Sequence, residues 1–507
     1  MQPILIQAVF LPIILSPVAY VLGRRIGARA GWFAFAALLY STLLILLAAG
    51  SSSDYLENYD WQPIGTFGLR LDGLSVPFAA TIYILSTVLA VYSIPYMTHR
   101  IEEEVEEIQD KAERHRLFNH KIGLYFTYYL AYAAGMLGTV LATNLIQFYI
   151  FFELMLIPSF FLIAQFGYGD RVKISLMYFL WTHVGALLLL AGLLALGFLS
   201  GHFDMSLINT ASMNQSVLIW IAVAITVGLF VKLAAFGLHI WLPYAHAEAP
   251  TPISALLSPA MIGIGGYAVI RLLLFLLPAQ YEIITFATSI WGLITIIYGG
   301  LMALNQDDIK RFLAYSSVSQ MGYIIFGISS AYYVGVSGSV FQYVSHGTGK
   351  ALLFMAAGSI IMQTHGIRSI SNLGGLSRRL PITAIAAMVG FLAIIGVPPM
   401  NGFQSEWMLF YGSFAGALKT GSTAKLFITA AALVATALTA GYTLVMMKRV
   451  FYGETPEHLQ HVKEAGLTVT IPLLALAFIT ILLGIYPGLV TERLLPVIAS
   501  VLGGGAS

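Results

Sequence analysis

The feature that most constrains this chain is a long succession of apolar runs, most of them 20 residues or more in length. About 20 apolar residues are what an α-helix needs to cross the hydrocarbon core of a bilayer. Fourteen such runs can be placed along the chain, and charged residues make up only 9% of it. An ordinary soluble protein carries about 25% charged residues. The sequence therefore predicts an all-α integral membrane protein with about 14 transmembrane helices.

Short polar segments separate the predicted membrane helices. The helices are expected at residues 2–22, 30–49, 74–98, 122–141, 144–166, 173–199, 215–243, 253–277, 283–304, 310–331, 335–363, 380–412, 423–449 and 467–487. The first run has its arginines after the apolar stretch, unlike a secretory signal peptide, and is expected to be retained as a helix. The chain is expected to end soon after the last helix.

Two of these helices contain residues that interrupt a helix. The segments "GLHIWLPYAHAEAPTP" and "IGVPPMNGFQSEW" put Gly and Pro inside or beside the seventh and twelfth predicted helices. Interrupted helices in corresponding positions of two halves indicate an inverted-repeat transporter. Helices 4–8 and 9–13 are then the repeats. The predicted units are 1–121 (three helices and a charged loop), 122–277 (first repeat), 283–452 (second repeat) and 453–507 (a loop and the last helix).

The positions of the basic residues predict the orientation. Cytoplasmic loops are enriched in Lys and Arg, and with the N-terminus outside, 18 basic residues fall in inward loops, Lys310 among them. The outward side has five, and only Lys232 and Lys350 remain, both within the membrane. The outward five are Arg70, Arg271, Lys419, Lys425 and Arg493. A multi-pass protein of the plasma membrane with both termini outside is therefore expected.

Ionisable groups inside the membrane are costly and point to function by default. The candidates are Glu153, Lys232, His346, Lys350 and Glu406, with His183, His239 and Glu248 as secondary ones. Each has a purely structural alternative. The amine of Lys232 could snorkel towards water, Glu153 could hydrogen-bond a neighbouring helix, and His183 and His239 could be satisfied core residues.

His346 and Lys350 make a stronger case together. A spacing of four residues puts both on one helix face. Gln342, Ser345 and Thr348 add enough polarity to the same segment to hold water. Burial and neighbouring charges shift the protonation of such groups, so a water-linked series of Glu, Lys and His side chains predicts a proton relay through the bundle.

Cysteine is absent from the sequence. The chain therefore cannot bind an iron–sulfur cluster through thiolates or use a thiol in redox chemistry. No cofactor is expected in this chain, and iron–sulfur, nickel–iron or flavin centres are expected only in partner subunits.

Three segments carry a resemblance to a known family. "FFELMLIPSFFLI", "VKLAAFGLHIWLPYAHAEAPTPISALLSPAMIGIGGYAVIR" and "NQDDIKRFLAYSSVSQMGY" resemble the antiporter-like, proton-pumping subunits of respiratory complex I, especially its M-type subunit. The same superfamily includes the D subunit of Mrp-type Na⁺/H⁺ antiporters and membrane subunits of energy-converting hydrogenases. The resemblance covers residues 120–450 approximately, and it implies fourteen helices, two inverted five-helix repeats and broken helices 7 and 12.

The resemblance also implies roles for single residues. Glu153 matches the family's glutamate on helix 5 and Lys232 its partner lysine on helix 7. His346 and Lys350 match relay positions on helix 11, and Glu406 matches the terminal residue on helix 12. The chain departs from the family in helix 8, which has nothing ionisable in "SPAMIGIGGY", and in helix 10, where Gln320 replaces a common histidine.

The sequence leaves three functions open. The first is a non-redox, H⁺-translocating (and possibly Na⁺-translocating) membrane subunit of a complex I-like redox complex, with antiporter-like, small membrane and peripheral redox subunits as partners. The second is a D-type subunit of an Mrp antiporter, and the third is a structural subunit with no ion path. No nucleic acid is expected as a partner.

One polar segment lies outside the part that resembles the family. In "MTHRIEEEVEEIQDKAERHR", Glu107 and Lys111, like Asp110 and Arg114, are favourable pairs four residues apart. A solvated helix is expected over Met97 to Arg116, with contact to a peripheral subunit as the alternative.

Overall fold

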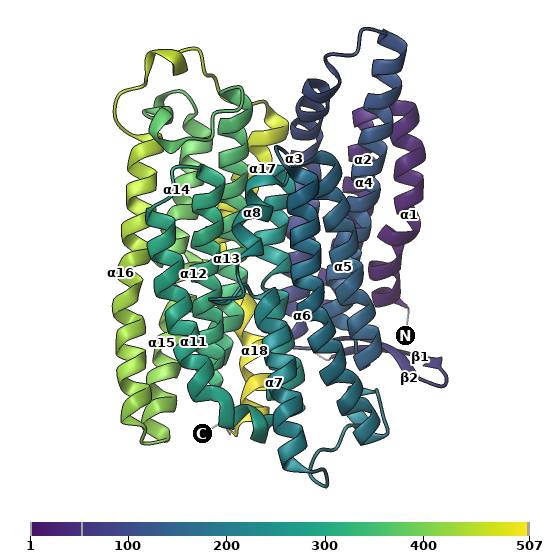
Figure 1. The fold of residues 1–507 in the computed structure, drawn as a ribbon, viewed down its shortest axis with the longest axis vertical. Helices are drawn as coiled ribbons and strands as arrows, with labels where there is room; N and C mark the ends of the chain where they lie inside the picture. The colour runs from purple at the N-terminus through teal and green to yellow at the C-terminus, as the bar shows by residue number, and fades with distance from the viewer. Residues whose placement is uncertain (1–2, 52–53, 504–507) are drawn as a thin grey trace.

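The computed structural model describes residues 3–51 and 54–503. Long helices run side by side along the long axis of the molecule (Figure 1). The first half of the chain forms α1 (Ile4–Ile26), α2 (Ala30–Ala49), α3 (Ser75–Val105), α4 (Lys111–Leu141), α5 (Leu145–Phe166), α6 (Arg171–Ser200), α7 (Gln215–Lys232) and α8 (Trp241–Glu248). The second half forms α9 (Thr251–Leu256), α10 (Ile264–Ala268), α11 (Pro278–Leu304), α12 (Ile309–Ile328), α13 (Tyr333–Gln363), α14 (Pro381–Ile395), α15 (Asn401–Lys419), α16 (Thr423–Phe451), α17 (Leu467–Ile485) and α18 (Gly488–Leu502).

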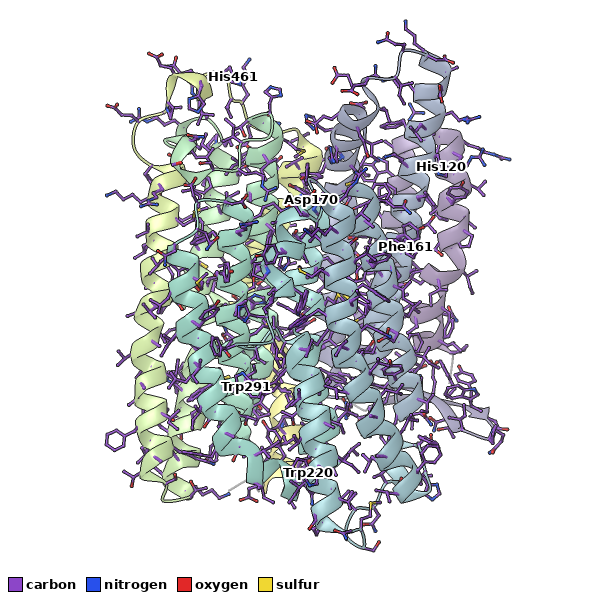
Figure 2. All side chains as sticks on the ribbon, viewed as in Figure 1. His120, Phe161, Asp170, Trp220, Trp291 and His461 are labelled. Atoms are coloured by element: carbon purple, nitrogen blue, oxygen red, sulfur yellow. The ribbon has the colours of Figure 1, made fainter. Side chains whose placement is uncertain are left out.

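The length and composition of these helices identify a helical, multi-pass membrane protein. Within the described residues, 10 stretches are long and apolar enough to cross a membrane, with α1 and α2 counted as one stretch, Ile4–Ala49. Three further helices, α12, α13 and α15, have 20, 31 and 19 residues but are more polar. Exposed aromatic side chains such as Trp220 lie near the lower end of the bundle (Figure 2). The count of fourteen crossings stays a prediction.

Side-chain caps explain where two of the helices begin. Asn144 accepts a hydrogen bond from the Ile146 backbone N–H at 2.9 Å and begins α5, so the predicted division at "ATN" is confirmed. Asp308 accepts one from the Lys310 N–H at 2.9 Å and begins α12. Asn and Asp are favoured caps because their oxygens satisfy the free N–H groups of a first turn.

Both predicted interruptions of membrane helices are present. α7 ends at Lys232, and the chain passes through Ala234 (φ 50°) and Gly237 (φ 83°) before α8 begins at Trp241. α14 ends at Ile395, followed by Gly396 (φ 77°), and α15 begins at Asn401. Both interruptions fall inside the predicted spans 215–243 and 380–412, because positive φ cannot continue a right-handed helix.

The next predicted helix, 253–277, is also irregular. It consists of α9 and α10 with π-helical turns at Leu257–Met261 and Val269–Leu274. Single π turns inside α-helices are frequent at functional sites. This stretch, Thr251–Leu274, is almost completely buried, which places it at the centre of the bundle.

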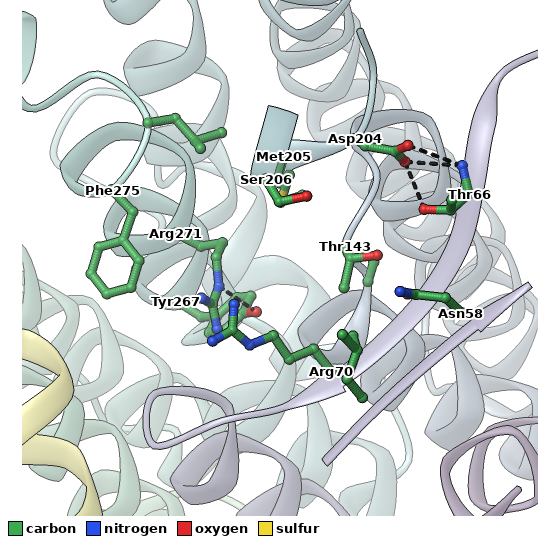
Figure 3. Close-up of a pocket in the computed structure, with 13 residues that line it drawn as sticks. Asn58, Thr66, Arg70, Thr143, Asp204, Met205, Ser206, Tyr267, Arg271 and Phe275 are labelled. Carbon is green, nitrogen blue, oxygen red and sulfur yellow. Dashed lines mark hydrogen bonds between the residues drawn. The ribbon is translucent and has the colours of Figure 1, made fainter. Parts of the chain in front are cut away.

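The prediction of an all-α chain is wrong at one place. β1 (Tyr55–Trp61) and β2 (Gly65–Leu71) form an antiparallel hairpin between α2 and α3. The Asp204 carboxylate, in the segment after α6, accepts hydrogen bonds from the Thr66 backbone N–H and hydroxyl, both at 3.0 Å (Figure 3). The hairpin is therefore fixed to the end of the bundle that lies lowest in Figure 1.

The polar segment from Met97 to Arg116 is not one separate helix. α3 continues to Val105, and α4 begins at Lys111, where Asp110 accepts a hydrogen bond from the Ala112 N–H at 2.8 Å. The segment therefore extends two membrane helices into the polar region instead of forming an independent element. Its contact with a peripheral subunit stays a prediction.

α13 lies at the centre of the second half of the bundle. Every residue from Gly335 to Ile361 is buried, and the helix packs against α3, α9, α12, α14, α15, α17 and α18. This helix carries His346 and Lys350, so the structure places both in the interior of the protein.

Candidate functional site

The first carboxylate of the site is that of Glu153 on α5, a partly buried residue. Its Oε2 lies 3.2 Å from Nδ1 of His183 on α6, and its Oε1 is buried without a hydrogen-bond partner in the structure. The His183 ring stacks on Phe179 with 5.4 Å between ring centroids. Two sequence candidates are thus in direct contact, and one carboxylate oxygen remains available to a water or a proton.

Lys232 is the last residue of α7 and is only 2% exposed. Its Nζ has no hydrogen-bond partner in the structure and lies 5.0 Å from the Phe152 ring centroid. Among the described residues, Glu153 and Lys232 form no ion pair within 4.0 Å, but the two interact electrostatically; the side chain within 4.0 Å of the Glu153 carboxylate is His183. A cation in the last turn of a helix is stabilised by the carbonyl end of the helix dipole. The position therefore suits a charged amine that is not held by one acceptor.

His239 lies in the interruption between α7 and α8. It is 6% exposed, and its Nδ1 accepts a hydrogen bond from the Gly237 backbone N–H at 3.2 Å. Its ring is 4.8 Å from that of Tyr298, centroid to centroid. The ring of His239 is thus held to the backbone of the break through Nδ1, and its role in a proton path stays a prediction.

His346 and Lys350 are both fully buried on α13. Neither ring nitrogen of His346 has a hydrogen-bond partner in the structure. The Nζ of Lys350 donates to the Leu313 carbonyl at 3.2 Å and to the Ser316 hydroxyl at 2.6 Å, both on α12. Lys350 is therefore held by α12, whereas the imidazole of His346 is unpaired.

Two further buried groups belong to this region, and the sequence predictions did not include them. His246 on α8 is fully buried, stacks on Phe354 at 5.0 Å and has no partner for either ring nitrogen in the structure. Lys310 on α12 is fully buried and donates from Nζ to the carbonyls of Ala247 and Ala249. His246 is in electrostatic contact with Lys310 and Lys350, and His346 with Lys350 and His246.

The reasons for these two omissions differ. His246 stands in the segment that most resembles the family, but the predicted helix ended at 243, so the histidine fell outside the membrane. Lys310 was assigned to an inward loop, because a lysine in the first turn of a helix normally reaches water. Its burial depends on the carbonyls at the end of α8, which the sequence does not bring next to it.

Polar side chains connect α12, α13 and α15. Gln320 accepts a hydrogen bond from Gln342, and Gln342 accepts one from the Ser405 hydroxyl at 2.6 Å. Asn401 accepts a hydrogen bond from the Ser345 hydroxyl at 3.2 Å and donates one to Thr348 at 3.0 Å. Gln320 is thus part of a neutral hydrogen-bonded series that ends at Ser405, next to Glu406 in the chain.

Glu406 lies in the second turn of α15, just after the interruption. A Cβ on Gly396 would lie 2.6 Å from its Oε2, so the carboxylate packs against the backbone of the break. Gly396 provides both the positive φ and the room for this approach. No hydrogen bond or ion pair to the Glu406 carboxylate is present within residues 3–51 and 54–503.

Glu248 is the last residue of α8. Its backbone carbonyl accepts a hydrogen bond from the Tyr168 N–H at 2.8 Å, and a Cβ on Gly169 would lie 2.8 Å from its Oε2. The carboxylate therefore packs against the segment between α5 and α6, apart from the groups on α13.

The site consists of two clusters, one around the end of α7 and one around α8, α12 and α13. The first comprises Glu153, His183 and Lys232; the second comprises His246, Lys310, His346 and Lys350, followed by the neutral series and Glu406. Most of these groups can gain or lose a proton. Five of them have buried polar atoms without a partner among the described residues: Glu153, Lys232, His246, His346 and Gln320. Such an arrangement can pass protons along a line if water bridges the gaps.

Comparisons with known proteins were made for the whole chain. A family model described as "NADH:quinone oxidoreductase/Mrp antiporter, TM" matches residues 142–432. A second, described as "NADH-Ubiquinone oxidoreductase (complex I), chain 5 N-terminus", matches residues 61–104. The chain is 31% identical to F420H2 dehydrogenase subunit M of Methanosarcina mazei, over 98% of this chain and 97% of that protein. It is also 31% identical to NADH-quinone oxidoreductase subunit M of Rhodobacter capsulatus, over 98% and 96%.

Solved structures of two membrane complexes contain chains with the same fold as this one. A chain of the Mrp complex from a Dietzia species superimposes with a TM-score of 0.82 at 26% identity, over 98% of this chain and 51% of that chain. A chain of respiratory complex I from Thermus thermophilus gives 0.83 at 24% identity, over 99% and 100%. The overall fold is thus shared with chains of known membrane complexes.

Proposed function

The chain belongs to the NADH:quinone oxidoreductase/Mrp antiporter membrane family, and from that premise we propose that it moves protons through the two clusters of buried charges. It is an antiporter-like membrane subunit of a complex I-like redox complex. It works beside other membrane subunits and peripheral subunits that carry the redox centres, in the plasma membrane. The proposed path includes Glu153, Lys232, His346, Lys350 and Glu406, with H⁺ as the ion and Na⁺ as a further candidate.

The observation that carries this proposal is the set of buried, unpaired ionisable atoms beside the two interrupted helices. Leaving a buried polar group without a partner costs about 1–3 kcal/mol and more for a charge. Lys232, His246 and His346 all have such atoms. Packing does not require them, since apolar residues would fill the same space at lower cost, so a functional role explains why they are present.

The proposed architecture has fourteen crossings. The ten apolar stretches give eleven crossings, because one of them contains both α1 and α2, and α8 is counted with α7 as one interrupted crossing. The helices α12 and α13, together with α14 and α15 as a second interrupted crossing, add three more. The two interruptions then fall in corresponding positions of two five-helix repeats. Both termini lie on the side opposite most of the loop lysines and arginines, which is the outside by the charge rule.

The proton path has direct and water-mediated parts. His183 and Glu153 are within hydrogen-bond distance of each other at 3.2 Å. Lys232 has no fixed acceptor, so it can exchange between Glu153 and water as neighbouring charges change. In the second cluster, moving a proton to or from His346 changes the field on Lys350 and His246. Protonation of one cluster thereby biases the next.

The second candidate function is a subunit of a multisubunit Mrp antiporter. It is favoured by the superposition with a chain of an Mrp complex at 26% identity. The near-complete coverage of the M subunits of redox complexes, 96% and 97% of their length, favours the first function. In a purely structural subunit, the third alternative, neutralising Lys232 would leave ion transport unchanged.

Replacing Lys232 with Met tests the proposal. The purified complex would be reconstituted in vesicles, and ion pumping and electron transfer would be measured together. Loss of pumping is expected at unchanged assembly, because the amine that exchanges protons is removed; concurrent loss of electron transfer would indicate tight coupling. The matched control is Lys173→Met, which removes an exposed lysine from α6. Normal pumping by the Lys232 variant would reject the path.

A further inference from the structure

A long apolar cavity lies on the side of α13 away from the ionisable residues. It has a volume of about 380 Å³ and lies between the end of α2, the first half of α3, α13, α17 and α18. Its wall on α3 runs from Val76 to Leu85, which is about 14 Å of helix axis at the α-helical rise. The cavity is therefore elongated and follows the direction of the membrane helices.

The wall of this cavity is almost entirely aliphatic. Along α3, Val76, Ala80 and Ile84 are spaced by four residues, line the cavity and are only partly buried, unlike most of this helix. The polar atom of Thr348 is already used, since its hydroxyl accepts from Asn401 at 3.0 Å. Apolar cavities of this kind stay free of water and bind apolar molecules.

One end of the cavity carries a positive charge. Arg493 of α18 lines it and donates from its guanidinium to the Ala49 carbonyl at the end of α2. This end of the cavity therefore lies where α2 ends and α3 begins. A guanidinium binds a phosphate well, and the polar headgroups of a bilayer lie at this level of a membrane helix.

We infer that this cavity is a specific phospholipid site, in which one acyl chain lies along α3 and the phosphate lies near Arg493. Acyl chains are the abundant apolar molecules inside a membrane. The elongated shape and aliphatic wall of the cavity fit an acyl chain, and the positive charge at its mouth fits the phosphate of the same lipid. The acyl chain packs against Val344 and Thr348 of α13. The lipid therefore supports the helix that carries His346 and Lys350 from the face opposite those residues.

Photolabelling of the intact purified complex tests the site directly. The probe is a phosphatidylglycerol with a diazirine in the middle of one acyl chain, and the labelled peptides are mapped by mass spectrometry. Label is expected in the peptides of α3 and α17 that line the cavity, in addition to exposed positions such as Val434 on α16. Label on α16 without label on α3 or α17 would overturn the inference.

Filling the cavity provides the second test. Ala80→Phe places a ring in the space of the acyl chain and should abolish labelling of α3 and α17. Delipidated wild-type complex should gain thermal stability when phosphatidylglycerol is returned, whereas the Ala80→Phe variant should not. The matched control is Val434→Phe on the lipid-exposed surface, which should respond as the wild type does. An equal response of the wild type and the Ala80→Phe variant would reject the site.

The charged mouth is tested separately. Arg493→Gln should lower the labelling of α3, and Arg493→Lys should restore most of it, because the positive charge returns. Equal labelling in all three proteins would leave the cavity without a phosphate contact at Arg493 and would overturn that part of the inference.

Discussion

The buried charges at the lower end of the bundle are paired, whereas several ionisable groups in its middle are not. Near the hairpin, the Asp72 carboxylate is bound by Arg271 at 2.7 Å and by the Ser75 backbone N–H at 2.9 Å, and Arg70 is 3.5 Å away. In the middle, Lys232, His246 and His346 have polar atoms with no partner in the part of the chain that the structure describes. Both regions are buried. The difference teaches that this chain can satisfy a buried charge fully, so the unpaired groups are a specific feature of the middle.

The lower region also shows what full pairing does to a proton equilibrium. Burial opposes the charge of Asp72, but attraction to Arg271 and hydrogen bonds from Arg271 and Ser75 outweigh it and lower the pKa of Asp72 to about 2. The unfolded value is about 3.9. The stabilisation is therefore fully present above about pH 4 and is lost as the pH falls towards 2. Asp72 is a fixed anion at every physiological pH.

The largest effect on stability is expected for Asp72→Asn. Removing one partner of a buried pair leaves Arg271 uncompensated, and the free energy of unfolding should fall by about 3–5 kcal/mol. Ion transport per assembled complex should not change, because the pair lies outside the path. Thermal unfolding and vesicle transport would be measured side by side. Asp54→Asn, which removes an exposed partner of Arg70, is the control and should cost less than about 1 kcal/mol. A transport defect in assembled Asp72→Asn protein would contradict the assignment of this region to structure.

Lys310→Met tests a charge that shares features with both the paired charges near the hairpin and the unpaired charges in the middle of the bundle. Its amine is paired, as in the lower region, but it is in contact with His246 in the middle. Loss of the amine leaves the carbonyls of Ala247 and Ala249 without this donor, and the free energy of unfolding should fall by about 1–3 kcal/mol. The exposed Lys463→Met is the control. Unchanged stability together with lost transport would show that Lys310 acts in proton movement and is not only a structural member of the second cluster.

Much of the architecture could be predicted from the sequence, because membrane helices are defined by local composition. The interruptions at "GLHIWLP" and "IGVPPMNG" were predicted from Gly and Pro, which act on their own backbone. The hairpin was missed because "YLENYDW" and "GTFGLRL" are short and mixed in polarity. The helix α18 was missed because its buried face, Val490, Leu494 and Ile498, is defined only by the neighbours it packs against.

The residues of the candidate site were predicted better than their contacts. Glu153, His183, Lys232, His346, Lys350 and Glu406 were found because charge in an apolar run is visible locally. The closeness of His183 was not visible: its Nδ1 lies 3.2 Å from Glu153, whereas Lys232 interacts electrostatically with Glu153 from beyond ion-pair distance. Contacts between helices depend on helix rotation and on the interruptions, which shift the side chains that follow them.

Substitution of one glycine in each interruption allows the two breaks to be compared directly. Gly237 and Gly396 both have positive φ, so an alanine at either position should cost about 1–2 kcal/mol. A Cβ at Gly237 would meet nothing within 4 Å, whereas one at Gly396 would reach Oε2 of Glu406. Gly396→Ala should therefore also displace the carboxylate and lower transport, while Gly237→Ala should keep it. Equal transport by the two variants would show that the position of Glu406 against the break is unimportant.

The smallest effect on stability is expected at His346, the group that contrasts most with the fully paired Asp72. Replacing it with Leu removes two unpaired buried nitrogens and keeps an apolar side chain of moderate size in the same space, so no hydrogen bond is lost. The free energy of unfolding should stay unchanged or rise, since the cost of the unpaired polar atoms disappears. Transport should nevertheless be lost, because Leu cannot carry a proton. Ser337→Ala is the control: it removes another unpaired buried polar atom from α13 but no ionisable group, and should leave transport intact. A variant that is as stable as the wild type but inactive would mean that the imidazole of His346 is needed for transport and not for packing. A stable and active one would mean that protons cross the bundle without it.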